Sequence, residues 1–555
     1  MPKPLKYSLL IGLIGAIFYI PFLGGVHLFD WDEINFAEIS REMVLLKEYL
    51  RVYVDFKPFW EKPPLFFWLQ SSAMQIFGTN EFAARFPNAI CGILTLIVLF
   101  NIGRKLYDTR FGLLWALVYF GSVLPFLYFK SGIIDPWFNL FIFSGLYVFI
   151  LGYWKKEKAE NISLKYSHWF YFLVAGLLIG LGILTKGPVA YLVAGLTMGV
   201  YWIFKKFRIY VSPLHFLIFT LAASLATLTW YGLETLKNGP WFITEFNKYQ
   251  YRLFSTPDAG HKGFLGYHFV VLFFGVFPAS VFAIRSFFKM PAENAFYKND
   301  FRLWMAIMFW VVLILFSVVK SKIIHYSSLC YFPMTFLAAL VIYKIIQKEI
   351  KFGAWLRGGI LFIGGIYALA TLALPLLGKN IEWLTPLLKK DPFALANLEA
   401  SPGWNFWDSM PGFFMILLLG ASFFFFKKGF FEKGIYRLFG GTAIFVMLTL
   451  IFDINNIEAY SQRAAIEFFK ERQGEKAYVV THGYKSYAHL FYTQKPPVDN
   501  ENYYDKSWLY EGNIDRPVYV VTKINKAKDF ENHPNFKEVG RKNGFVFFKR
   551  EPKSE

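Results

Sequence analysis

Runs of about twenty apolar residues, each long enough to cross about 30 Å of hydrocarbon as an α-helix, recur along the chain up to residue 453. They predict spans near residues 7–26, 82–102, 111–129, 135–154, 168–184, 188–204, 212–231, 266–284, 303–319, 326–343, 358–377, 411–426 and 438–453. We therefore expect a polytopic α-helical membrane protein with about thirteen transmembrane helices, the first of them retained because no small-residue cleavage site follows it.

The pattern changes after the last apolar run. AYSQRAAIEFFKERQ has the spacing of an amphipathic helix, and KAYVVTHG, RPVYVVTKI and GFVFFKRE are typical of strands. We therefore expect two units, a transmembrane catalytic domain over residues 1–455 and a small α/β domain over residues 456–555.

Basic residues between the spans alternate from loop to loop. The loops around residues 104–110, 155–158, 205–208, 285–302, 348–357 and 427–437 are rich in Lys and Arg, whereas the short loops between them carry few. The positive-inside rule places the basic loops and the N-terminus in the cytoplasm. The long loops 27–81, 232–265 and 378–410 and the C-terminal domain would then share the extracytoplasmic side.

Composition agrees with a membrane protein, because 55% of the residues are hydrophobic, 21% aromatic and only 17% charged. The net charge of +19 lies in short loops beside the spans, so it reflects topology and not a nucleic-acid partner. Cys91 and Cys330 both fall inside predicted spans, which excludes a disulfide framework and a Cys-based metal site. We expect no nucleotide or organic cofactor.

Charge is concentrated in the first long loop, in FDWDEINFAEISREM and FWEKPPL, and charge held so close to a bilayer suggests a functional site. Asp32 and Glu33 are the candidate catalytic carboxylates, since a general base must be held beside its substrate, although Asp32 could simply cap the following helix. Glu61 and Lys62 precede two prolines. Lys62 could bind a lipid phosphate or only extend toward water.

Other candidate side chains lie near the predicted outer ends of spans. Asp135 opens one span, Lys186 closes another in LTKGPV, and KSKIIHY contains His325 and Tyr326. Their cations could attract phosphate or act as membrane anchors.

Two candidates lie in the loop 232–265. Arg252 in KYQYRLF could grip a phosphate or face water. His261 in DAGHKGF could bind zinc or a similar divalent metal together with Glu61, although two ligands so far apart form no metal motif.

Six segments occur in the order and at about the spacings of a known group: DWDEINFAEISREM, WEKPPLFFWLQSSAMQIFGTNEFAARFPN, SGIIDP, LGILTKGPVAYL, GHKGF and KSKIIHYSSLCYFP. With them the membrane part resembles the superfamily of bacterial lipid A 4-amino-4-deoxy-L-arabinose transferases and protein O-mannosyltransferases. The resemblance implies a GT-C glycosyltransferase fold and inverting transfer of a sugar from a polyisoprenyl-phosphate carrier such as undecaprenyl phosphate, at the bacterial cytoplasmic membrane.

The resemblance also implies roles for individual residues. Asp32 matches the essential acid of the family, Glu61 and His261 match a metal pair, Lys62 matches a ligand of the carrier phosphate, and Tyr326 matches a tyrosine of the same cavity. Two positions depart from the family: Asn35 stands where an Arg is usual, and Phe59 where a Tyr is usual. The missing Arg weakens the case for lipid A, itself a phosphate, as acceptor.

The sequence leaves rival functions open. The acceptor could be lipid A or another glycolipid, or the Ser and Thr hydroxyls of secreted proteins with mannose as the sugar. From another class, the chain could transport a lipid-linked sugar, but the predicted spans hold almost no ionisable residues, which disfavours an ion-coupled carrier.

Overall fold

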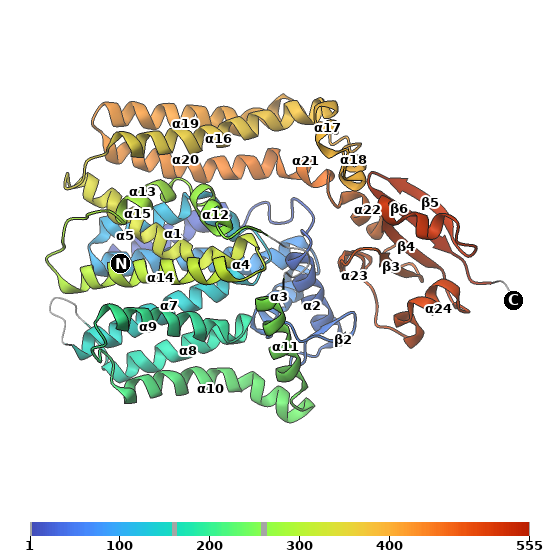
Figure 1. Ribbon diagram of the computed structural model, residues 1–555, viewed down its shortest axis with the longest axis horizontal. Coiled ribbons are helices and arrows are strands. Elements are labelled where there is room, and N and C mark those ends of the chain that lie inside the picture. Colours follow the sequence, from blue (N-terminus) through green and yellow to red (C-terminus); the bar gives the residue numbers. More distant parts are fainter. Residues whose placement is uncertain (1–2, 158–163, 257–262, 554–555) are drawn as a thin grey trace.

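The apolar segments form long helices whose axes run in nearly the same direction, and a small sheet lies at one end of them (Figure 1). This computed structural model describes residues 3–157, 164–256 and 263–553. Its membrane part contains α1 (Lys3–Tyr19), α4 (Glu81–Leu106), α5 (Thr109–Phe120), α6 (Val123–Tyr128), α7 (Asp135–Lys156), α8 (His168–Lys186), α9 (Val189–Phe204), α10 (Pro213–Asn238), α12 (Tyr267–Gly275), α13 (Ala279–Ser286), α14 (Phe296–Val318), α15 (Tyr331–Ile346), α16 (Ala354–Lys379), α19 (Met410–Lys427) and α20 (Phe431–Phe452).

Helices overlap every expected span, although α1 ends at Tyr19, before the expected end at residue 26. Among the described residues, nine helices are long and apolar enough to cross a membrane, or ten if α12 and α13, which meet at 117°, form one broken span. Helices α5 and α9 are apolar but shorter. The polytopic helical class is confirmed, whereas the count of about thirteen spans stays a prediction.

The long loops contain short elements next to the sheet (Figure 1). The first loop forms α2 (Asp32–Leu46), the hairpin β1 (Tyr53–Val54) and β2 (Lys57–Pro58), and α3 (Leu65–Phe77). Helix α11 (Trp241–Ser255) belongs to the second loop, and η2 (Ile381–Trp383), α17 (Thr385–Leu388), α18 (Pro392–Asn397) and η3 (Phe406–Ser409) belong to the third. All three loops and the C-terminal domain thus lie at one end of the helices.

The C-terminal domain is built on a four-stranded sheet of order β3-β4-β6-β5, in which β3 and β4 are parallel and the other pairs are antiparallel. Its elements are α21 (Ile454–Ala459), α22 (Arg463–Glu471), β3 (Tyr478–His482), α23 (Ala488–Thr493), η4 (Glu501–Tyr504), α24 (Lys506–Glu511), β4 (Val518–Lys523), η5 (Ile524–Lys526), α25 (Lys528–Glu531), β5 (Lys537–Lys542) and β6 (Phe545–Arg550). The three expected strands are β3, β4 and β6. Strand β5 escaped the sequence analysis because it is a charged, exposed edge strand.

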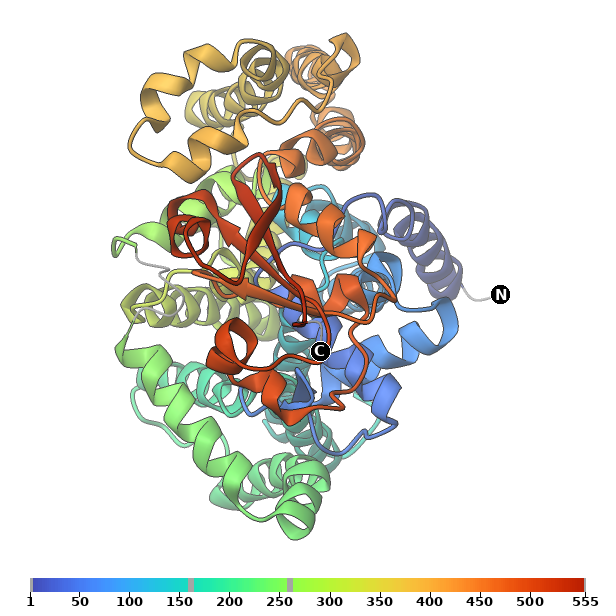
Figure 2. The ribbon, with the colours of Figure 1, turned by 90° about the vertical axis from the view of Figure 1, so that its right-hand side faces the viewer.

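One hydrophobic core joins this domain to the first loop. Ile34 and Ala37 of α2 and Met74 of α3 pack in the same cluster as Phe469 of α22 and Phe547 of β6. Viewed from the sheet side, the domain covers the middle of the helix ends, and α16, α19 and α20 stand to one side (Figure 2). Residues from the two ends of the sequence therefore fix the position of α2 together.

Candidate active site

A cavity of about 360 Å³ opens among α2, α11 and the nearby ends of α7, α8, α9 and α14. One part of its wall is apolar and includes Val189, Leu192, Leu315, Phe316 and Val319. The other part is polar or aromatic and includes Asp32, Asn35, Phe59, Glu61, Lys62, Asp135, Asn139, Lys186, Tyr249, His325 and Tyr326. A cavity with an apolar side and a cluster of charge suits an amphipathic ligand with an anionic head.

Four ionisable side chains lie in a row across the polar wall. Nε2 of His325 lies 3.1 Å from Oδ2 of Asp32 and 3.8 Å from Oδ2 of Asp135. Nζ of Lys186 lies 2.5 Å from Oδ1 of Asp135. The two carboxylates and two basic groups come from four elements and hold one another in place.

Helix ends bring these groups to the cavity. Asp32 and Asp135 are the first residues of α2 and α7, where the helix dipole favours negative charge. The N-cap of α2 is Trp31, which makes no side-chain capping hydrogen bond. The alternative that Asp32 is the capping residue is therefore wrong, and its carboxylate faces the cavity.

Lys186 is the last residue of α8, and Gly187 ends that helix. Gly187 has φ +103°, and a Cβ there would stand 2.4 Å from the ring of Phe246 on α11. Only glycine meets both requirements. The glycine thus allows α11 to pack closely beside Lys186.

The pKa of Asp32 is about 2. Burial alone would raise the pKa of Asp32, but the hydrogen bond and charge of His325 and the charges of Lys62 and Lys186 outweigh burial and lower the pKa. Asp32 is therefore ionised throughout the physiological pH range.

Lys62 faces Tyr249 across the cavity. Its Nζ lies 3.4 Å from the Tyr249 hydroxyl and 4.8 Å from the ring centroid. Burial lowers the pKa of Lys62, and the negative charges of Glu61 and Asp32 oppose that shift. Pro63 and Pro64 follow directly and lead into α3, which fixes the backbone of the Glu61–Lys62 pair.

The neutral candidates also reach the cavity. Asn35 lies one turn after Asp32 on α2, and its buried Oδ1 has no hydrogen-bond partner in the described part of the chain. Phe59 lines the wall beside Glu61, and the Tyr326 ring lies 5.0 Å from Nζ of Lys186. Asn35 thus offers a polar oxygen to a ligand.

Glu33 does not belong to this site. Its carboxylate accepts hydrogen bonds from Nε and Nη2 of Arg85, at 3.0 and 2.8 Å, and from the backbone N–H groups of Phe29 and Gly132. Burial raises the pKa of Glu33, but Arg85 and these hydrogen bonds lower it overall. Glu33 anchors α2 to α4, which corrects the expectation of a catalytic role.

Of two further expectations, the structure does not support one and leaves the other untested. Arg252 is exposed on α11, its guanidinium 5.1 Å from the ring of Tyr249, and it is not part of the cavity wall. His261 lies outside the described residues, and the described part contains no group of three or more potential metal ligands. The expected metal pair of Glu61 and His261 therefore stays a prediction.

The sequence analysis missed Tyr249, Asn139 and the contact between His325 and Asp32. Asn139 donates hydrogen bonds to the hydroxyls of Tyr128 and Ser328, at 2.7 and 2.8 Å. Tyr249 and Asn139 have no local signature, because Tyr249 lies on an aromatic-rich helix and Asn139 on an apolar one. The contact between His325 and Asp32 forms only when distant segments pack together. The nearest sequence signal for Asn139 is its polar side chain close to a predicted outer span end.

Known proteins resemble this chain in sequence and in fold. Residues 61–230 match the family described as dolichyl-phosphate-mannose-protein mannosyltransferase. The undecaprenyl phosphate-alpha-4-amino-4-deoxy-L-arabinose arabinosyl transferase of Photorhabdus laumondii is 26% identical over 335 residues, 60% of this chain and 58% of that protein. The protein of the same name from Pectobacterium carotovorum is 25% identical over 437 residues, 75% of this chain and 76% of that protein. The chain thus spans less than two thirds of the length of the first relative.

A solved structure shares the architecture. The crystal structure of ArnT from Cupriavidus metallidurans bound to undecaprenyl phosphate matches with a TM-score of 0.78 and 16% identity, over 98% of each chain. Its apo form matches with a TM-score of 0.76 and covers 99% of this chain and 98% of that chain. This likeness confirms the expected fold class, including the small α/β domain that follows the helices.

Proposed function

We propose that this chain, which resembles the aminoarabinose transferases and the protein O-mannosyltransferases, transfers a sugar from a polyisoprenyl-phosphate carrier to lipid A or a related glycolipid. The observation that carries the proposal is the cavity in which Lys62, Lys186 and Asp32 converge beside an apolar wall. The lysines suit a carrier phosphate, and the apolar wall suits a prenyl chain.

In the proposed reaction, an acceptor oxygen attacks the anomeric carbon of the donor sugar from the face opposite the phosphate. A new carbon–oxygen bond forms, and the bond from that carbon to the phosphate oxygen breaks with inversion. The departing polyprenyl phosphate keeps the electron pair. Lys62 and Lys186 stabilise this developing negative charge. Such electrostatic stabilisation of the transition state is usually the largest single contribution to catalysis.

The ionisation of Asp32 favours a phosphate acceptor. A group with a pKa of about 2 is a poor proton acceptor for a hydroxyl at neutral pH. An ionised phosphate oxygen needs no base, so Asp32 would then orient His325 and the substrates. This supports lipid A or another phosphorylated glycolipid as acceptor, although Asn35 stands where the related enzymes usually have an Arg.

A second candidate is transfer of mannose to Ser or Thr hydroxyls of proteins. The match of residues 61–230 to the protein mannosyltransferase family favours it, and the imidazole of His325, 3.1 Å from Asp32, could take the hydroxyl proton. In this version Asp32 orients the imidazole, and the proton of the acceptor hydroxyl is transferred to His325.

Assay of purified protein in lipid vesicles with a radiolabelled polyprenyl-phosphate sugar distinguishes these functions. Label on added lipid A supports the first proposal, and label on a Ser- and Thr-containing peptide supports the second. Movement of intact donor across the vesicle membrane without loss of the sugar–phosphate bond would instead identify a transporter.

We also propose that the enzyme lies in the bacterial cytoplasmic membrane with its N-terminus in the cytoplasm and the cavity and sheet domain outside. The alternation of basic and non-basic loops supports this orientation.

We also propose that Glu61 and His261 hold a divalent cation such as zinc. When bound, this cation would act as a Lewis acid toward phosphate. Metal analysis of the purified protein and of a His261→Ala variant tests it.

A further inference from the structure

A second cavity, of about 390 Å³, lies where the sheet domain meets the first and third long loops. The sheet domain contributes Tyr484, Lys485 and Lys523, α18 contributes Phe393 and Asn397, and the residues before α2 contribute Asp30. The cavity thus exists only because three segments distant in sequence meet there.

The second cavity carries a net positive charge. Nζ of Lys523 lies 4.4 Å from the centroid of the Phe393 ring, and Nζ of Lys485 lies 4.8 Å from that of Trp31. Asp30 supplies a carboxylate whose charge interacts with Lys523, so the two lysines exceed it by one charge. Cations, amides and aromatic rings together suit a sugar that carries a phosphate or another anionic group.

The second cavity adjoins the first along the chain. Asp30 lines the second, whereas Trp31 and Asp32 line the first. The Trp31 ring stacks on Tyr487 of the sheet domain, with centroids 5.9 Å apart. A molecule bound against Asp30 would therefore contact the same short segment that carries Asp32.

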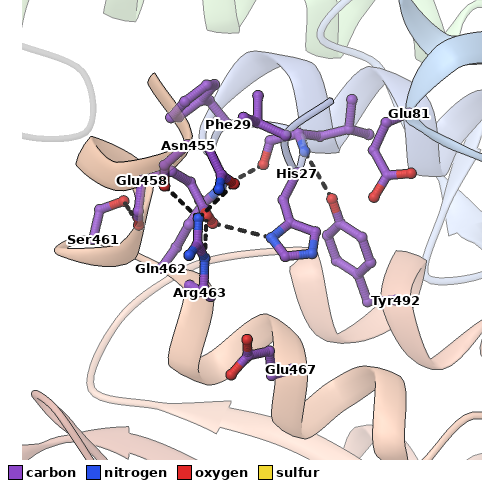
Figure 3. A network of polar contacts seen from close by, with 12 residues as sticks. His27, Phe29, Glu81, Asn455, Glu458, Ser461, Gln462, Arg463, Glu467 and Tyr492 are labelled. Carbon is purple, nitrogen blue, oxygen red and sulfur yellow. Dashed lines mark hydrogen bonds and ion pairs between the residues drawn. The ribbon is translucent and has the colours of Figure 1, made fainter. Parts of the chain in front are cut away.

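Hydrogen bonds hold this junction rigid (Figure 3). Gln462 donates to the carbonyl of Leu28 at 2.6 Å and accepts from the N–H of Asp30 at 3.2 Å. Nδ1 of His27 lies 3.1 Å from Oε1 of Glu458, which also pairs with Arg463. A fixed junction keeps the two cavities in a constant relation, as transfer between two bound substrates requires.

Exposed apolar side chains precede α18, the helix that lines the second cavity. Trp383 and Leu387, just before α18, are 60% and 78% exposed, and Lys389 and Lys390 follow them. Exposed Trp and Leu beside Lys at the end of membrane helices are typical of a membrane interface. A lipid could therefore keep its chains in the bilayer while its head group reaches the second cavity.

We propose that the second cavity is the acceptor subsite and binds the phosphate-bearing sugar head group of a glycolipid, with Lys485 and Lys523 as phosphate ligands. This inference rests on the proposed function and specifies the acceptor half of that reaction. Phe393 and Tyr484 provide apolar faces for the sugar.

The test measures binding of bisphosphorylated lipid A, and of the same lipid after phosphatase treatment, to the purified full-length protein. Reversal of both charges in Lys485→Glu/Lys523→Glu is expected to weaken binding of the phosphorylated lipid about tenfold or more, because charge-assisted hydrogen bonds to phosphate are lost. Lys485→Arg/Lys523→Arg should retain binding, and so should the control Lys476→Glu/Lys537→Glu, whose lysines are exposed on the same domain outside this cavity.

Equal binding of the two lipids to the wild type, or equal binding of phosphorylated lipid A to the wild type and the Glu variant, would overturn the subsite. If the Glu variant transfers sugar to lipid A as fast as the wild type, the subsite is also overturned, but the proposed function stands. Lysine-dependent binding without any transfer by the wild type would support the subsite and refute the proposed function. Equal thermal unfolding midpoints for all variants show that they are folded.

Discussion

Asp32 links two groups of residues in the candidate active site. Its carboxylate contacts His325, which lies near Asp135, and its negative charge interacts with Lys62. We expect Asp32→Asn to reduce sugar transfer by about 10²-fold or more, since the neutral amide keeps the shape but brings no negative charge to His325 and Lys62. Transfer from a radiolabelled donor in vesicles measures the loss. Near-normal turnover by a folded Asp32→Asn protein would exclude any essential role.

The low pKa of Asp32 also predicts how its contribution to stability depends on pH. The pKa falls from about 3.9 in the unfolded chain to about 2 in the folded one. Its ionised form is therefore stabilised by folding above the unfolded pKa, and the contribution is lost as the pH falls toward 2. The difference in unfolding midpoint between wild type and Asp32→Asn should be constant at neutral pH and shrink below about pH 4. A difference that shrinks instead near pH 6 would contradict this assignment.

Among the elements, α2 depends on the buried pair of Glu33 and Arg85. Removing one partner leaves the other charge buried and unpaired, which costs about 3–5 kcal/mol. We therefore expect Arg85→Met to lower the free energy of unfolding by that amount in detergent. The control Arg541→Met breaks an exposed pair of the sheet domain and should cost at most about 1 kcal/mol. Equal effects of the two substitutions would show that the buried pair does not anchor α2.

The junction of α8 and α11 gives a second prediction at this scale. Gly187→Ala introduces a Cβ 2.4 Å from Phe246 at φ +103°, a strain of about 1–3 kcal/mol. We expect α11 to shift, which moves Tyr249 away from Lys62 and raises the KM for the lipid-linked donor more than it lowers kcat. Gly199→Ala is the control, because a Cβ there meets nothing within 4 Å. An unchanged donor KM in Gly187→Ala would show that α11 does not shape the donor site.

For the whole molecule, the orientation in the membrane is open to a direct measurement. With Cys91 and Cys330 replaced, single cysteines at Lys156 and Lys428 should be shielded from an impermeant thiol reagent in intact cells, and one at Lys537 should react. Permeabilised cells, in which all three should react, are the control. Labelling in the opposite sense would place the sheet domain and both cavities in the cytoplasm.

Much of the architecture follows from the sequence, because spans and buried strands have local hydrophobic patterns. Helices overlap all the expected spans, although α1 ends at Tyr19 and the expected span 266–284 is broken between α12 and α13. Strands β3, β4 and β6 lie in the expected segments, and Asp32, Lys62, Lys186 and Tyr326 do line one cavity. Glu33 was misjudged because its partner Arg85 lies on another helix and has no local signature. The second cavity was also invisible, since its walls come from three segments that meet only in the folded chain.

The long-range contacts of the first loop have a consequence for synthesis. The N–H of Leu28 donates a hydrogen bond to the hydroxyl of Tyr492, 464 positions later, and α2 shares its core with β6. The ribosome therefore releases α2 long before it makes the sheet that holds α2 in place. The nascent chain can insert its helices one after another while α2 still lacks the sheet domain against which it packs. A prematurely terminated copy would remain in the membrane without a completed candidate site.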